Sequence, residues 1–432
     1  MASVSTLSMH SVRKLVGLAT LMVLAVVLGG CGGGAGGSSS APIPSTFISN
    51  QPNAVQLTVD NGPANYTGPP NVNRLFTSVT VCESGTTHCK LIDHVLVDTG
   101  STGLRILNAA LVGPTLNLSP VTVAGGQPLL SCVQFADRSY AFGPVVTADV
   151  TLGPQTASNL PIQIMASPTY ATLLPNCATG FTAINTVNDL GANGILGVGL
   201  YAQDCGSFCT VISANDYYYT CAPGNCTIAS GATGTTATLA QQLTNPITRF
   251  GADSNGVVID LPFVPAPGTT SIIGQMLFGV GTQANNATTG TTPLRLNGLG
   301  NIKTVLTPGS TYNKSFIDSG SNGLFFGPKP DPTNPTIPTI FTVCGDFYCP
   351  SGNPSVHATL SGANGINAPF TFVVGYASNL FSNGYSVLPT LTGPMGDTTT
   401  FDWGLPFFYG RRVFFGIEGR STPLGTGPLI AF

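Results

Sequence analysis

The segment VDTGSTGL at residues 97–104 returns downstream as IDSGSNGL at residues 317–324, with Asp, a hydroxyl residue, Gly, Ser and a second Gly at identical spacing. Each copy follows a run of apolar residues, which is typical of a buried strand whose end presents the Asp in a tight turn. A motif repeated over this length indicates an internal duplication of the chain. The alternative is a pair of ordinary Gly-rich surface turns, which rarely share so many positions behind apolar strands.

Two such loops that face each other would bring together the carboxyl groups of Asp98 and Asp318. Two carboxylates in contact cannot both ionise cheaply, so the pair would share one proton and hold one water molecule. The ionised carboxylate could take a proton from that water while the protonated one donates to a carbonyl oxygen. The residues expected to support the pair are Thr99, Gly100 and Ser101 in the first copy, and Ser319, Gly320 and Ser321 in the second.

These residues resemble the paired signature of the pepsin-like aspartic peptidases, in which each of two lobes carries Asp-Thr-Gly or Asp-Ser-Gly followed by Ser or Thr. Residues 194–197 are similar to the hydrophobic-hydrophobic-Gly element behind the first active-site loop, and Trp403-Gly404 to its counterpart in the second lobe. Residues 273–279 resemble the Gly-rich strand that opens the second lobe. The resemblance runs from about residue 92 to the C terminus, in the family's order.

The resemblance implies an all-β, bilobal fold with a central cleft, and catalysis by Asp98 and Asp318 on a peptide or protein substrate without a cofactor. It also implies a hairpin that closes over substrate, for which residues 130–152 have the pattern. The Tyr expected on that flap falls on Phe135, with Tyr140 further along, and the Trp usually found after the first signature is Arg105. Both partners of the family's flap hydrogen bond are therefore absent.

Two functions follow from this pattern. The first is a hydrolase of the aspartic-peptidase type, because two buried acids that repel each other have no use in an inactive scaffold. The second is a non-catalytic binding or envelope-assembly protein on the same scaffold, since a fold does not determine a function. The missing flap residues favour the second function, and the intact carboxyl groups favour the first.

The N-terminal segment has the pattern of an export signal. Two basic residues precede an apolar run at residues 15–28, which is too short to span a bilayer. The run ends in LGGC, which resembles a bacterial lipobox whose Cys, here Cys31, carries the lipid. The resemblance predicts a signal peptide over residues 1–30, a flexible tether over 31–50, and an outer-membrane lipoprotein facing the periplasm or the cell surface. A plain secretory signal is the alternative.

Composition and length limit the remaining possibilities. A chain of 432 residues exceeds the usual size of a single core, so we expect one β lobe over residues 51–245 and another over 246–432. Charged residues are only 7% of the chain, with 54 Gly and 34 Pro, which favours short strands joined by turns. We also expect a short helix at residues 237–243 and a disulfide-braced surface insertion at 201–235. The formal net charge of −3 and the lack of a basic stripe argue against a nucleic-acid partner.

The chain has 11 Cys residues, and those other than Cys31 form an even set in a chain with an export signal. This favours disulfides over metal or redox sites. A metal site is also disfavoured by the few His residues and by the lack of a Cys-x-x-Cys motif. The predicted pairs are Cys82–Cys89, Cys205–Cys209, Cys221–Cys226, Cys344–Cys349 and, by remainder, Cys132–Cys177.

Overall fold

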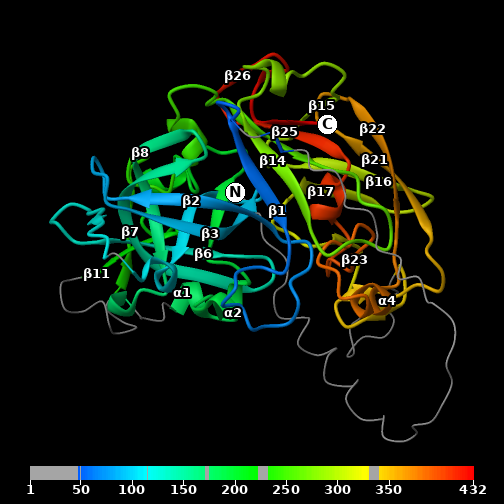
Figure 1. Cartoon of the computed structure of the whole chain (residues 1–432), viewed down its shortest axis with the longest axis horizontal. Coiled ribbons are helices and arrows are strands. Elements are labelled where there is room, and N and C mark those ends of the chain that lie inside the picture. The colour runs from blue at the N-terminus through cyan, green and yellow to red at the C-terminus, as the bar shows by residue number, and fades with distance from the viewer. Residues whose placement is uncertain (1–46, 49, 114, 171–174, 222–231, 330–339) are drawn as a thin grey trace, which may run out of the picture.

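The computed structural model describes residues 47–48, 50–113, 115–170, 175–221, 232–329 and 340–432 (Figure 1). Over these residues the fold is all-β with a few short helices, as the composition predicts. Their bounds are α1 (Pro175–Ala178), α2 (Val187–Leu190), α3 (Phe208–Val211) and α4 (Ala377–Ser382).

The described strands form two large sheets and two small ribbons. The first sheet has 17 strands: β1 (Ala54–Val59), β2 (Leu75–Cys82), β3 (Cys89–Asp98), β4 (Thr102–Leu107), β5 (Ser119–Pro120), β6 (Leu129–Gln134), β7 (Ser139–Leu152), β8 (Gln155–Met165), β9 (Thr182–Ala183), β10 (Gly194–Val198), β11 (Tyr218–Cys221), β12 (Ala232–Gly234), β13 (Gly256–Leu261), β14 (Ile272–Phe278), β15 (Pro293–Arg295), β25 (Arg411–Gly416) and β28 (Leu429–Ala431). The second has seven: β16 (Ile302–Thr307), β17 (Thr311–Ile317), β18 (Leu324–Phe326), β21 (Ser355–Ser361), β22 (Asn367–Val373), β23 (Thr392–Gly393) and β24 (Thr400–Trp403). The ribbons are β19 (Val343–Cys344) with β20 (Phe347–Tyr348), and β26 (Ser421–Thr422) with β27 (Gly425–Thr426).

In Figure 1 the strands β2, β3, β6, β7 and β8 gather on one side and β16, β17, β21 and β22 on the other, with β1 and β14 between them. Strand β14 pairs antiparallel with β1, from Ala54 opposite Leu277 to Val59 opposite Ile272. The first sheet therefore takes strands from both sides of the division predicted between residues 245 and 246.

One apolar core contains residues of both sheets. Val97 and Leu104 beside the first motif belong to it, as do Ile317 and Leu324 beside the second, and each is at most 2% exposed. Burying one such side chain contributes about 1.5–3 kcal/mol. The strands that carry the two motifs are thus held firmly by the same core.

The strand predicted before the first motif corresponds to β3, and the hairpin predicted at residues 130–152 corresponds to β6 and β7. The helix predicted at residues 237–243 is wrong, because this segment forms a turn. The Gln241 side chain accepts hydrogen bonds from the backbone N and the Oγ1 of Thr238, both at 2.8 Å. The backbone N atoms of Gln241 and Gln242 donate to the Thr238 carbonyl, which closes one turn, and the chain then leaves the helical path where Thr244 pairs with Gln203.

The disulfide predictions are confirmed where the structure describes both partners: Cys82–Cys89, Cys132–Cys177, Cys205–Cys209 and Cys344–Cys349. The predicted partner of Cys221, Cys226, lies outside the described residues, as do Cys31, the predicted signal peptide and nearly all of the tether. Among the described residues, none of the helices is both long enough and apolar enough for a membrane span.

Candidate active site

The two motifs lie in matching strand environments. Strand β3 ends at Asp98, and β17 ends one residue before Asp318. Strand β10 runs parallel to β3 and antiparallel to β4, with Leu196 opposite both Val97 and Leu104. Strand β24 likewise runs parallel to β17 and antiparallel to β18, with Trp403 opposite both Ile317 and Leu324. The segments predicted at residues 194–197 and 403–404 thus provide the same inserted strand in each copy.

Reciprocal hydrogen bonds join the two loops. The backbone N of Thr99 donates to Ser319 Oγ at 3.1 Å, and the backbone N of Ser319 donates to Thr99 Oγ1 at 2.9 Å. Ser319 Oγ donates to the carbonyl of Val97 at 2.8 Å, and Thr99 Oγ1 to that of Ile317 at 3.3 Å. Thr99 and Ser319 therefore brace the two motif loops against each other.

Asp98 and Asp318 are both fully buried, and the carboxyl group of Asp318 lies against the first loop. The backbone N of Gly100 donates to Asp98 Oδ1 at 2.8 Å, and that of Gly320 donates to Asp318 Oδ1 at 2.8 Å. A Cβ atom on Gly100 would lie 2.8 Å from the carboxyl carbon of Asp318. The first loop therefore requires Gly, because any side chain there would collide with the opposite carboxyl group.

The two carboxyl groups are close enough for a side-chain hydrogen bond between them to affect the pKa of each. Such a bond requires a proton on one of them, because an ionised carboxylate only accepts. Without that proton, the buried Oδ2 of Asp98 has no donor among the described residues. The geometry thus favours a pair that holds a single proton.

The surroundings differ between the two carboxyl groups. Burial raises the pKa of Asp98, and the proximity of Asp318 and Ser101, the backbone N of Gly100 and the charge of Arg105 oppose that rise. Burial raises the pKa of Asp318 well above its usual value, and the charges of Asp98 and Asp402 raise it further. The surrounding charges thus act unequally: Arg105 favours the ionised form of Asp98, and Asp402 disfavours the ionised form of Asp318.

Asp402 is a third buried carboxyl group at this place, and no motif in the sequence pointed to it. It immediately precedes Trp403 in β24, and Ser321 Oγ bridges it to the pair, at 2.6 Å from Asp402 Oδ2 and 2.8 Å from Asp318 Oδ2. Burial raises its pKa well above the usual value. The sequence did offer one signal for Asp402. It precedes Trp403-Gly404 at the position that is equivalent to the apolar Ile195 before Leu196-Gly197 in the first copy.

Ser101 and Ser321 occupy equivalent positions and have different contacts. Ser321 Oγ donates a hydrogen bond to Oδ2 of Asp318, the carboxyl group of its own motif. Ser101 Oγ is buried without a hydrogen-bond partner among the described residues, although it lies near enough to lower the pKa of Asp98. The two halves of the site are thus similar in backbone and unequal in side-chain contacts.

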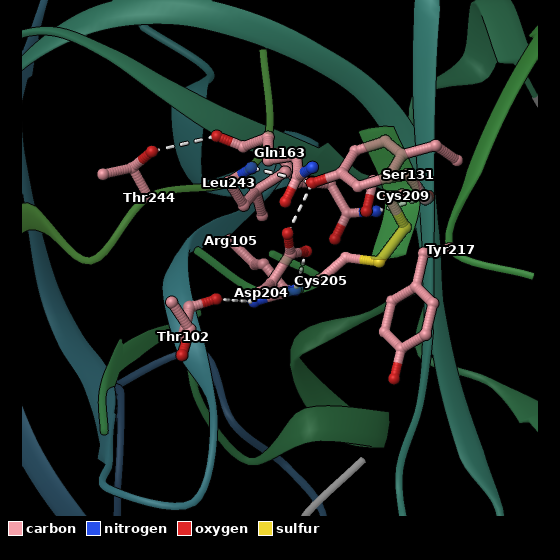
Figure 2. Close-up of polar contacts among 12 residues, drawn as sticks. Thr102, Arg105, Ser131, Gln163, Asp204, Cys205, Cys209, Tyr217, Leu243 and Thr244 are labelled. Carbon is pink, nitrogen blue, oxygen red and sulfur yellow. Dashed lines mark hydrogen bonds and ion pairs between the residues drawn. A yellow bond between two sulfur atoms is a disulfide. The ribbon is translucent and has the colours of Figure 1, made fainter. Parts of the chain in front are cut away.

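Arg105, which stands where the resembling family has Trp, is 1% exposed and lies behind the first loop. Figure 2 shows its side chain near Thr102 and Asp204: Nη1 donates to the Thr102 carbonyl at 2.8 Å, and Nη2 lies 3.2 Å from Asp204 Oδ2. The hydroxyl of Tyr218 donates to Asp204 Oδ1 at 2.5 Å. Burial raises the pKa of Asp204 to about 6, and the charge of Arg105 opposes the rise. The pair is buried, so the positive charge of Arg105 acts through a weakly screening interior.

The hairpin predicted to be a flap turns between Phe135 and Ser139, where Phe135 N donates to the Ser139 carbonyl at 2.8 Å. Phe135 is 3% exposed and packs in one apolar cluster, while Tyr140 is 5% exposed and packs in another beside Cys132 and Cys177. Both flap candidates, Phe135 and Tyr140, are thus packing residues in this structure. An aromatic ring at either position gains more from the core than from an open cleft.

The hairpin is also attached along its outer edge. Strand β11 comes from the insertion at residues 201–235 and pairs with β6, with Tyr218 opposite Ser131. The Cys132–Cys177 disulfide links the same strand to α1. Because β6 is paired on both edges and cross-linked, hinged closure of the hairpin would break several backbone hydrogen bonds.

A further buried cation, Arg74, precedes β2. Burial lowers the pKa of its guanidinium, whereas the charges of Asp137 at the hairpin turn and of Asp318 and Asp98 raise it. In the described part of the chain, no cluster of three or more His, Cys, Asp or Glu side chains is arranged to hold a metal ion.

The strands, sheets and disulfides define an all-β protein with few helices. The chain belongs to the family described as "Protein of unknown function (DUF3443)", whose model matches residues 49–432. No curated protein matches the chain. Among solved structures, the aspartic proteinase from Irpex lacteus is similar, with 14% sequence identity, a TM-score of 0.44, and coverage of 86% of this chain and 99% of that chain.

Proposed function

We propose that the chain is a hydrolase of the aspartic-peptidase type, in which Asp98 and Asp318 activate water against a peptide bond. The observation that carries the proposal is the buried pair of carboxyl groups, joined by the reciprocal Thr99 and Ser319 bonds and able to share one proton. Carboxyl groups whose pKa values are displaced by burial and by a specific charged partner cluster at catalytic sites. A bilobal arrangement with the pair between the lobes is part of this proposal.

The proposed reaction uses the proton order of the pair. Ionised Asp98 takes a proton from water, whose oxygen attacks the peptide carbonyl carbon, while Asp318 gives its proton to the carbonyl oxygen. Asp98 then passes its proton to the amide nitrogen as the C–N bond breaks, and Asp318 takes back a proton from the tetrahedral intermediate. The products are a carboxylic acid and an amine, and the pair again holds one proton.

The pH range of such a reaction follows from the two displaced pKa values. Activity requires Asp98 ionised and Asp318 protonated, so it falls below the pKa of the first and above that of the second. Both values are raised above 3.8, and that of Asp318 the more strongly. We therefore expect an activity range that extends from moderately acidic towards neutral pH.

The proposed location is the bacterial envelope. Lipidation of Cys31 would hold the protein at the outer membrane, with the peptide or protein substrate reached from the periplasm or the cell surface. A substrate at that place would meet near-neutral pH, which is consistent with the raised pKa of Asp318.

The test is cleavage of a peptide library from acidic to neutral pH by the wild type and by Asp98→Asn and Asp318→Asn. We expect each substitution to reduce cleavage by about 10²–10⁴-fold, the usual contribution of a positioned acid or base. Asp216→Asn, at an exposed carboxyl group, is the matched control and should cleave normally. Equal cleavage by all four proteins would refute the assignment of the pair.

The second candidate function is a binding protein on the same scaffold. The observation that favours it is the flap hairpin, whose aromatic residues Phe135 and Tyr140 pack inward rather than towards a substrate. No cleavage at any pH, together with saturable peptide binding by wild type and Asp98→Asn alike, would favour this function.

A further inference from the structure

The two halves of the site differ at one equivalent pair of strand positions. On the first side, Ile195 of β10 lies opposite Arg105 of β4. On the second side, the equivalent pair is Asp402 of β24 opposite Phe325 of β18. Each half thus pairs one buried residue that has an ionisable side chain with one apolar residue. The ionisable residue is basic and lies on β4 in the first half, and it is acidic and lies on β24 in the second half.

Arg105 is the charged residue of the first half. Its guanidinium is fixed by the Thr102 carbonyl at 2.8 Å and by Asp204 at 3.2 Å (Figure 2), and Asp204 is in turn held by Tyr218. The Tyr218 hydroxyl accepts a hydrogen bond from the backbone N of Leu243 at 2.8 Å, so the chain of contacts ends in a fixed backbone group. A cation held in this way favours the ionised form of a nearby carboxyl group.

Asp402 is the ionisable residue of the second half. Ser321 Oγ lies within hydrogen-bond distance of both Asp402 and Asp318, and a hydroxyl group has a single hydrogen to donate. One of the two carboxyl groups must therefore carry a proton to make the second contact favourable. If both Asp402 and Asp318 were ionised, two buried negative charges would lie against the same hydroxyl oxygen.

We propose that Arg105 and Asp402 are positioning residues that decide where the shared proton lies, keeping Asp98 ionised as the base and Asp318 protonated as the acid. The inference rests on the proposed function for its catalytic meaning, although the location of the proton is a property of the folded protein alone. Among the other charged groups nearby, Arg74 before β2 interacts with both Asp98 and Asp318. Asp137 at the hairpin turn acts on Arg74, and Asp204 pairs with Arg105.

The first test is the pH dependence of peptide cleavage by single variants. Arg105→Met removes the cation, so the acid limb, which reports Asp98, should move up by about one pH unit. Asp402→Asn keeps a polar partner for Ser321 and removes a competing acid, so the alkaline limb, which reports Asp318, should move down by about one pH unit. A residue with only a structural role would lower the rate at all pH values and leave both limbs in place.

Controls separate charge from folding. Arg105→Lys keeps the charge and should restore the acid limb, and Arg105→Met combined with Asp204→Asn avoids leaving a buried unpaired carboxylate if the single variant does not fold. Arg420→Met and Asp216→Asn change exposed groups of the same types and should leave both limbs unchanged.

The second test needs no cleavage. Carboxyl ¹³C chemical shifts of Asp-labelled protein, followed by NMR against pH, give the titration of the pair directly, with Asp98→Asn and Asp318→Asn used for assignment. We expect Arg105→Met to raise the midpoint of Asp98, and Asp402→Asn to lower that of Asp318, by about one pH unit each. Unchanged midpoints in both variants would overturn the inference. Shifted midpoints in a protein that cleaves nothing would retain it and reject the hydrolase.

Discussion

Ser319→Ala is expected to destabilise the protein through the hydrogen bonds that join the two motifs. The substitution removes the acceptor for the backbone N of Thr99, at 3.1 Å, and the donor to the Val97 carbonyl, at 2.8 Å. Both bonds are buried, and a buried polar group left without a partner costs about 1–3 kcal/mol. The two unpaired groups together would cost about 2–6 kcal/mol, and relaxation of the loop should recover part of this cost. We therefore expect the free energy of unfolding to decrease by about 2–4 kcal/mol.

The measurement is equilibrium unfolding in urea, with disulfides intact, of Ser319→Ala, Thr99→Val and the double variant. Each single change breaks bonds in the same reciprocal set, so the double variant should lose less than the sum of the two singles. A coupling energy of about 0.5–3 kcal/mol is expected for groups in one network. Ser355→Ala, at an exposed position at the start of β21, is the control and should change stability by less than about 0.5 kcal/mol.

The reasoning is refuted if Ser319→Ala loses no more stability than Ser355→Ala. Strict additivity of Ser319→Ala and Thr99→Val would be a different failure, because it would show that the two loops are stabilised independently of each other.

Three further outcomes are expected. Asp402→Asn should be more stable than wild type at pH 7 and equal to it near pH 3. The pKa of Asp402 in the folded protein lies above its ordinary value of 3.8, so the free energy of unfolding of the wild type falls as pH rises from 3.8 to that folded pKa. The decrease is up to about 1.4 kcal/mol for each unit by which the pKa is raised. Thermal unfolding across pH measures this, and the opposite sign would contradict it. Replacing Cys132 and Cys177 by Ala should cost about 2–4 kcal/mol, since their bridge spans 45 residues; recovery of either as a free thiol in untreated protein would exclude the bridge. Cys31→Ala should abolish fatty-acid labelling and release the protein from membranes, and labelling that survives would end the lipidation proposal.

Local pattern determined the elements and the motifs. Alternating apolar residues mark the strands β2 and β3, and the repeat at residues 97–104 and 317–324 identifies Asp98 and Asp318 as related residues. The short-range disulfides were predictable for the same reason, because a few residues of separation leave little choice of partner. These features depend on residues close together in the chain.

Tertiary structure decided which distant residues meet at the site. Asp402 reaches Ser321 across 81 residues only because β24 lies between β17 and β18, and Asp204 reaches Arg105 across 99 residues through the loop after β10. The inward packing of Phe135 and Tyr140 likewise follows from the pairing of β6 with both β7 and β11. Strand register and shared cores set such contacts, and a shift of one residue in register would exchange the buried and exposed faces of a strand. The sequence by itself therefore specified the two carboxyl groups, and only the assembled sheets specified the charges that make them unequal.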